Sequence, residues 1–368
     1  MKKRIHITLF LFSFPVFLFS QTDSVAGKFF IQPDLMVGKV APNYTNGFPK
    51  TSFYRGMALN FGWQADGKKH WHKHYNFPKT GIAVSFCQPG NDTVFGNNIN
   101  VYPYITINTA KKRDRIFDFK FGLGASYYTL HYDSLTNPEN EDIGSHFTWF
   151  FYAFINKQWK LNDHNELYLG AGFMHSSNGH TQLPNYGLNM AVANIGIQHF
   201  FSYYRPDQRV LTDIATNKMK YYKYYKDFKW GIWLRSGLGF HERGNTTGPV
   251  GGKKYAVYSQ AVGATLTYNH FTRFRGGFTY KFYDSYYDYI LNDTVTYEHP
   301  KREASALTLF LGTEFLIGRI AIDLEGALHL YRPFYYKFFH TYEKESDFEY
   351  FLKNLFVTKV GLNAYLFK

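Results

Sequence analysis

The sequence predicts an all-β protein, a transmembrane antiparallel β-barrel of the outer membrane with about 12–14 strands. Three observations lead to this prediction. The chain begins with a secretion signal, apolar and polar residues alternate with a period of two, and aromatic residues make up 21% of the chain although its mean hydropathy is only −0.35. This combination is typical of strands that face lipid on one side and a polar lumen on the other.

Residues 1–20 have the features of a signal peptide. Three basic residues at 2–4 are followed by an apolar run over 7–19. That run is too short to cross a membrane, because a spanning helix needs about 20 apolar residues. No later apolar run is long enough either, so the sequence predicts no transmembrane helix. We expect residues 21–368 to form a single outer-membrane barrel domain.

Net charge and cysteine content exclude several classes of function. The chain carries a formal charge of +13, three charges of which lie in the signal peptide and leave +10 after its removal. The basic residues are scattered through predicted turns, with no basic helix or nucleic-acid motif, so no nucleic-acid partner is expected. The single cysteine, Cys87, excludes a disulfide framework and a multi-cysteine metal site.

Period-two alternation predicts the strands directly. In residues 117–129, for example, phenylalanines fall on one face and Asp118 and Lys120 on the other. A soluble β-sandwich would alternate as well, but it would bury its aromatic face between two sheets. Candidate strands start near residues 27, 52, 80, 95, 115, 143, 164, 187, 223, 253, 271, 304, 319 and 356.

The connections alternate in length, as outer-membrane barrels require. Those after even-numbered strands are mostly short. Two exceptions, 66–79 and 206–222, are expected to carry small structured pieces if the strand count holds. The long connections follow odd-numbered strands and are predicted to be extracellular: 41–51, 133–142, 178–186, 242–252, 283–302 and 333–355.

One strand end combines the groups of a serine esterase. His175 and Ser177 continue the apolar, outward-facing row of the strand that starts near 164. Residues two apart on a strand share a face and lie about 7 Å apart, so the imidazole can take the serine proton. Asn189 heads the outward row of the next strand, where its amide oxygen can orient the imidazole. Asn178 and the backbone N–H of Gly179 are the expected oxyanion donors.

A family resemblance rests on one continuous stretch, His175-x-Ser177-Asn178-Gly179 followed by Pro184-Asn185-x-Gly187-x-Asn189. The stretch resembles the outer-membrane lipid A 3-O-deacylases, the PagL-type acyloxyacyl hydrolases. The resemblance implies a base and a nucleophile at His175 and Ser177 on the barrel exterior. The family has an acidic residue where this chain has Asn189, so the third member of the triad departs from the family pattern.

The same stretch also resembles outer-membrane phospholipase A. That family has a His-x-Ser-Asn-Gly motif and a triad asparagine twelve residues after the serine, which is the spacing between Ser177 and Asn189. The expected function is removal of an ester-linked acyl chain from lipid A in the outer leaflet. The alternative is hydrolysis of glycerophospholipids. No cofactor is expected, calcium enters only with the phospholipase alternative, and a homodimer is left open.

A non-catalytic barrel, either a pore or a surface-binding protein, is the alternative from another class. Two further side-chain groups are weaker candidates for chemistry. The histidines at 70, 72 and 74 would share a face on a strand and could hold a metal, although solvated histidines are the simpler interpretation. Asp323 and Glu325 could act as paired carboxylates, although acids lining the lumen explain them equally well.

Overall fold

The protein folds almost entirely into strands, as the sequence predicts. The predicted signal peptide, 1–20, and the connection 206–222 lie outside the described part of the chain. In that part, no helix is long and apolar enough to cross a membrane. The computed structural model describes residues 28–44, 47–66, 69–108, 117–201, 227–244, 246–292, 298–338, 340, 348 and 356–366.

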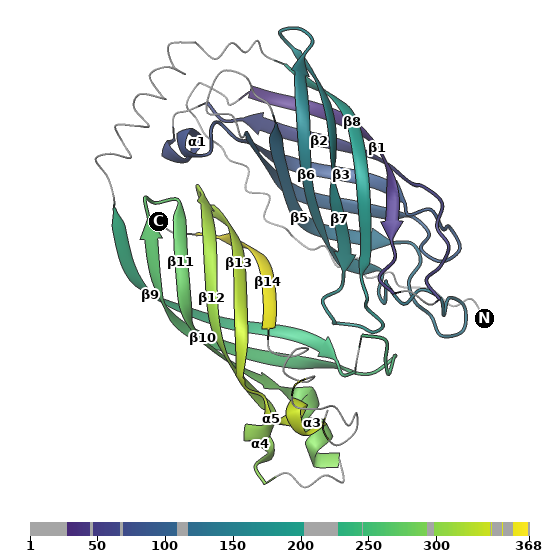
Figure 1. Cartoon of the computed structure of the whole chain (residues 1–368), viewed down its shortest axis with the longest axis vertical. Helices are drawn as coiled ribbons and strands as arrows, with labels where there is room; N and C mark the ends of the chain where they lie inside the picture. Colours follow the sequence, from purple (N-terminus) through teal and green to yellow (C-terminus); the bar gives the residue numbers. More distant parts are fainter. Residues whose placement is uncertain are drawn as a thin grey trace, which may run out of the picture.

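The first eight strands form a closed antiparallel barrel (Figure 1). Each strand pairs with the next in sequence, and β1 closes the barrel by pairing with β8, with Leu35 opposite Ile195. Closure pairs both edges of every strand in this barrel, so no row of backbone N–H and C=O groups is left unpaired at an edge. The strands are β1 (Lys28–Ala41), β2 (Tyr54–Gln64), β3 (Lys79–Gln88), β4 (Asn98–Asn108), β5 (Asp118–Tyr128), β6 (Phe147–Lys160), β7 (Asn165–Ser177) and β8 (Leu188–Phe200).

The remaining six strands form a second antiparallel sheet beside the barrel (Figure 1). They are β9 (Phe228–Glu242), β10 (Lys254–Tyr268), β11 (Thr272–Tyr283), β12 (Ser305–Ile317), β13 (Ile320–Tyr331) and β14 (Phe356–Ala364). Three short helices lie at one end of this sheet, α3 (Asp284–Asn292), α4 (Pro300–Glu303) and α5 (Pro333–Phe338).

All fourteen predicted strands are present, each starting within a few residues of its expected position. Eight of them close the barrel and six form the second sheet, a division that alternation alone does not reveal because both sets alternate in the same way. The expected structured piece in the connection 66–79 is the short helix α1 (His70–His74). The single-domain organisation over 21–368 stays a prediction.

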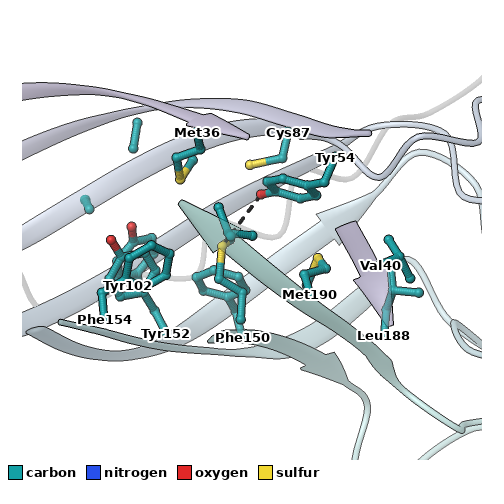
Figure 2. Packing of buried hydrophobic residues seen from close by; sticks show 14 of the residues in the cluster. Met36, Val40, Tyr54, Cys87, Tyr102, Phe150, Tyr152, Phe154, Leu188 and Met190 are labelled. Carbon is teal, nitrogen blue, oxygen red and sulfur yellow. Dashed lines mark hydrogen bonds between the residues drawn. The ribbon is translucent and has the colours of Figure 1, made fainter. Parts of the chain in front are cut away.

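The outer wall of the barrel is apolar and its interior is filled. Large apolar side chains such as Leu35, Trp149 and Ile195 point outward and are about half exposed or more. Eight strands enclose a space just wide enough for side chains. Tyr54, Phe150 and their neighbours fill one half of it, and the Tyr54 hydroxyl lies 3.8 Å from the sulfur of a methionine on β7 (Figure 2).

The other half of the interior is polar, so the expected polar lumen is present only in part. Lys120 donates to Asn60 at 2.7 Å and lies 3.9 Å from Asp34, and Lys79 contacts Glu166 at 3.2 Å. Buried charges are costly unless paired, and both lysines have carboxylate partners. The apolar half lies toward the barrel end that carries the connections after β1, β3, β5 and β7. We call this end the site rim.

Candidate active site

The predicted catalytic strand runs to the site rim with its outward row intact. In β7, Leu169 and Phe173 are exposed on the outer face, whereas Met174 and Ser176 are buried inside. His175 therefore continues the outward row, and Ser177, on the same face, ends the strand. Because side chains alternate along β7, the polar pair His175 and Ser177 lies on the apolar outer wall of the barrel.

His175 and Asn189 face each other across the β7–β8 pair. The Nδ1 atom of His175 lies 2.7 Å from Oδ1 of Asn189. An amide oxygen only accepts hydrogen bonds, so this contact fixes the proton on Nδ1 and leaves the lone pair on Nε2. The neighbour relation expected from the sequence is present, and with the proton on Nδ1 the Nε2 atom is free to accept a hydrogen bond.

The hydroxyl of Ser177 is held by the loop that follows β7. It donates to Oδ1 of Asn185 at 3.2 Å, accepts from Nδ2 of the same asparagine at 2.9 Å, and accepts from the backbone N–H of Gly179 at 3.2 Å. Between the described atoms of His175 and Ser177 there is no hydrogen bond. Asn185 lies inside the family motif, but its position in the chain predicts no role for it, because only the fold of the loop turns its amide toward the serine.

The two expected oxyanion donors lie in different surroundings. The Gly179 N–H already points at the serine oxygen. The side-chain amide of Asn178 is buried and donates to the Ser145 hydroxyl at 3.2 Å and to the Gln182 carbonyl at 2.7 Å. Asn178 therefore ties the loop to its neighbours, and its side chain would have to release one of these bonds to reach a substrate.

Gly187 makes room for the imidazole. Its φ of +74° lies in the left-handed region that favours glycine, and a Cβ atom there would lie 2.8 Å from Cε1 of His175 and 3.1 Å from Cβ of Ser177. A glycine at this position of the motif therefore has a local explanation: the loop backbone passes too close to His175 and Ser177 to leave room for a side chain.

A second layer of polar groups lies behind Asn189. The Nδ2 atom of Asn189 donates to Oδ1 of Asn43, which lies in the β1–β2 connection. Nδ2 of Asn43 in turn donates to the Gly187 carbonyl. It also donates, at 2.9 Å, to Oδ1 of Asp142 in the β5–β6 connection. Asp142 is fully buried, and burial raises the pKa of this carboxyl to about 7. Sequence reasoning missed this layer because its members come from connections far apart in the chain.

The second sheet reaches the same loop through the β9–β10 connection. The carboxylate of Glu242 accepts the Leu183 N–H at 2.7 Å, and the Thr246 carbonyl accepts the Asn185 N–H at 2.8 Å. The loop that positions Asn185 is therefore supported from both sides, by the barrel and by the sheet.

The weaker sequence candidates have structural explanations. The three histidines belong to α1 rather than to a strand, and His72 contacts Asp66 at 3.0 Å. Asp323 and Glu325 pair with arginines, Glu325 through two contacts to Arg235 at 2.9 and 3.0 Å. Within the described ranges, no group of three or more His, Cys, Asp or Glu residues could hold a metal ion.

The closed barrel, its apolar outer wall and the polar pair at its rim define an outer-membrane β-barrel whose candidate site faces outward. Residues 56–198, from β2 to β8, match the family model described as lipid A 3-O-deacylase (PagL). The resemblance expected from the motif is confirmed over this region, and the protein is located in the bacterial outer membrane.

Solved structures with a similar fold include small outer-membrane barrels. Neisserial surface protein A is 9% identical, with a TM-score of 0.29 over 47% of this chain and 97% of that one. The outer membrane enzyme PagL is 16% identical, with a TM-score of 0.29 over 45% and 97%. Ail of Yersinia pestis is 10% identical, with a TM-score of 0.26 over 47% and 99%. A comparison with curated proteins gives no match.

Proposed function

We propose that this protein is a serine esterase that removes an ester-linked acyl chain from lipid A, with Ser177 as nucleophile, His175 as base and Asn189 as the orienting group. The observation that carries the proposal is the 2.7 Å contact between His175 and Asn189 on the outer wall, with Ser177 two residues after His175 on the same face. The family match over residues 56–198 supports lipid A as the substrate class.

The first half of the reaction acylates the serine. Ser177 turns from Asn185 toward Nε2 of His175 when substrate binds, because catalytic hydrogen bonds often tighten only in the substrate complex. Its oxygen forms a bond to the ester carbonyl carbon while Nε2 takes the hydroxyl proton. The ester C–O bond then breaks, and the leaving sugar oxygen receives that proton from His175.

The second half regenerates the enzyme. A water molecule gives its proton to Nε2 and attacks the acyl carbon, and Ser177 regains the proton as the fatty acid leaves. In both halves negative charge develops on the carbonyl oxygen. The Gly179 N–H and the Asn185 amide already contact the serine oxygen, so they lie close to that charge, and Asn178 could join after releasing a loop contact. One such donor contributes about 3–4 kcal/mol in related chemistry.

The wall around the serine suits an acyl chain. Trp149 is the cross-strand neighbour of Ser177 on β6, and Phe151 is the neighbour of His175. Together with Phe173 on β7 they form an aromatic outer surface beside and below the pair, with Phe151 only partly exposed. A lipid standing in the outer leaflet would present its ester at the depth of the site rim and its chain along this surface, which puts the active site on the outer-leaflet side.

The deciding experiment compares two adjacent serines. Ser177→Ala should abolish release of the hydroxyacyl chain from lipid A, measured by mass spectrometry of outer membranes that contain the protein. Ser176→Ala is the matched control, because its side chain points into the barrel. It should retain full activity. Identical lipid A profiles for wild type and Ser177→Ala would refute the esterase proposal.

The same lipid extracts separate the rival functions. Asn189 is the observation that favours a phospholipase, and that enzyme would release lysophospholipid in a reaction that chelation of calcium stops. A pore would conduct ions in planar bilayers, although the packed interior weighs against it. A homodimer would appear as a doubled mass in detergent at concentrations where the enzyme is active.

A further inference from the structure

The hydrogen bonds behind His175 form a chain with a fixed direction. Asp142 as a carboxylate only accepts, so Asn43 must turn its NH₂ group toward it, and the Gly187 carbonyl requires the same orientation. The carbonyl oxygen of Asn43 then faces Asn189, which must present its own NH₂ group there. The only group left for His175 is the Asn189 oxygen.

We propose that Asp142 and Asn43 are positioning residues of the esterase, and that the buried carboxylate, acting through two amides, sets the tautomer of His175. This inference rests on the proposed function. The chain has an asparagine where the resembling family has an acid, and the charge that orients the histidine is thus supplied from another connection of the same rim. An isolated asparagine could turn its amide over, and the relay prevents this.

The surroundings of Asp142 fit a role beyond loop structure. The residue is fully buried, yet among the described residues no lysine or arginine forms a salt bridge with it. The titratable groups that act on it are Glu141, Tyr44 and Tyr128, and Tyr44 in turn interacts with Tyr186. None of these is a cation, so the ionised carboxylate is stabilised by neutral hydrogen-bond donors, first the Asn43 amide and then the Tyr44 hydroxyl.

The first experiment replaces the carboxylate in the full-length protein. Asp142→Asn keeps the shape but lets residue 142 offer either an acceptor or a donor, so only the Gly187 carbonyl still favours the original direction of the chain. Loss of the correct tautomer costs about 10⁴-fold when the direct partner is changed in a serine protease. With two amides in between we expect kcat to fall about 10- to 100-fold, KM to change little, and the acid limb of the pH profile to become shallower.

The controls separate positioning from folding. Glu139→Gln removes a carboxylate from the same connection at an exposed position and should leave kcat unchanged. The double variant Asp142→Asn, Asn189→Asp moves the carboxylate next to His175, so it should recover most of the activity that Asp142→Asn loses. A merely structural role for Asp142 predicts no such recovery, because the loop would still lack its carboxylate.

A second readout does not need turnover. Nitrogen-15 NMR of His175 in detergent reports which ring nitrogen carries the proton. We expect the Nδ1–H form in wild type and a mixture of tautomers in Asp142→Asn and in Asn43→Leu. If both variants keep the wild-type tautomer and kcat, the relay is refuted, even where Ser177→Ala abolishes hydrolysis. If wild type hydrolyses no lipid, the esterase proposal fails, and the NMR result alone decides the relay.

Discussion

At the residue scale, Gly187 shows how the loop after β7 and the His175–Ser177 pair depend on each other. Its carbonyl accepts from Asn43, and a Cβ atom added to it would lie against His175 and Ser177. A side chain here would meet the imidazole edge before anything else. The imidazole would have to move, and its contact with Asn189 would lengthen.

Gly187→Ala should therefore lower kcat by about tenfold or more, since a misplacement of about 1 Å costs up to a hundredfold. The left-handed backbone adds a loss of about 1–2 kcal/mol in stability. Gly251→Ala is the matched control, because Gly251 has the same φ of +74° but no atom within 4 Å of the added Cβ. It should show the stability loss without the loss of kcat. Equal kcat in both variants would contradict the steric explanation.

Asp142 also has a thermodynamic signature. Its pKa is raised from 3.8 to about 7 by burial, so the folded protein binds this proton more tightly than the unfolded chain does. The protonated Asp142 side chain is the form that the folded protein favours. Its contribution to the free energy of unfolding is complete below pH 3.8 and is lost as the pH rises to about 7. Ionised Asp142 thus costs stability on the order of a few kcal/mol. Urea unfolding at several pH values should show that the free energy of unfolding of Asp142→Asn increases relative to that of wild type between pH 4 and 7. If the two proteins have parallel plots of unfolding free energy against pH, this explanation is contradicted.

At the element scale, the end of β9 and the β9–β10 connection link the second sheet to the loop between β7 and β8. The two oxygens of buried Glu242 accept the N–H groups of Leu183 and Gly252, and the Glu242 N–H donates to the His180 carbonyl. One carboxylate therefore joins the loop after β7 to the hairpin of another sheet.

Glu242→Gln should loosen this junction, because the new NH₂ group faces a backbone donor and leaves it unsatisfied. We expect a loss of about 1–3 kcal/mol in stability together with a lower kcat. Glu303→Gln serves as the control: it is a buried carboxylate in α4, paired with Lys337 at 2.8 Å and without contact to the active-site loop. It should cost stability but leave kcat intact. A Glu242→Gln enzyme with wild-type kcat would show that the sheet does not support the site.

The sequence predicts elements better than it predicts their partners. Alternation locates every strand because the faces of a strand are set by neighbouring residues, and the same rule places His175, Ser177 and Asn189 together on one face. The relay residues Asn43 and Asp142 come from separate connections, so no local pattern joins them to Asn189. The helices α3 to α5 and the division into two sheets likewise depend on contacts between distant segments.

At the scale of the whole molecule, the barrel and the second sheet have the same distribution of side chains on their two faces. Both have an outward apolar face, with Ile195 on β8 and Leu234 on β9 as typical members. Both collect charged side chains on the other face, where in the second sheet Arg275 lies 3.7 Å from Glu314 and Arg235 pairs with Glu325. Because the pattern is the same, we expect both outward faces to contact lipid, as the single-domain prediction requires.

Arginine substitution tests this expectation for each sheet separately. Ile195→Arg and Leu234→Arg place a charge near the middle of β8 and β9, and each should destabilise the protein in lipid by about 2–4 kcal/mol, the cost of arginine at the bilayer midplane. Leu135→Arg is the control, because Leu135 is 90% exposed in the connection after β5 and should tolerate the charge. Stability is measured by unfolding in vesicles. If Leu234→Arg behaves like Leu135→Arg while Ile195→Arg destabilises, then only the closed barrel lies in the membrane, and the second sheet meets water.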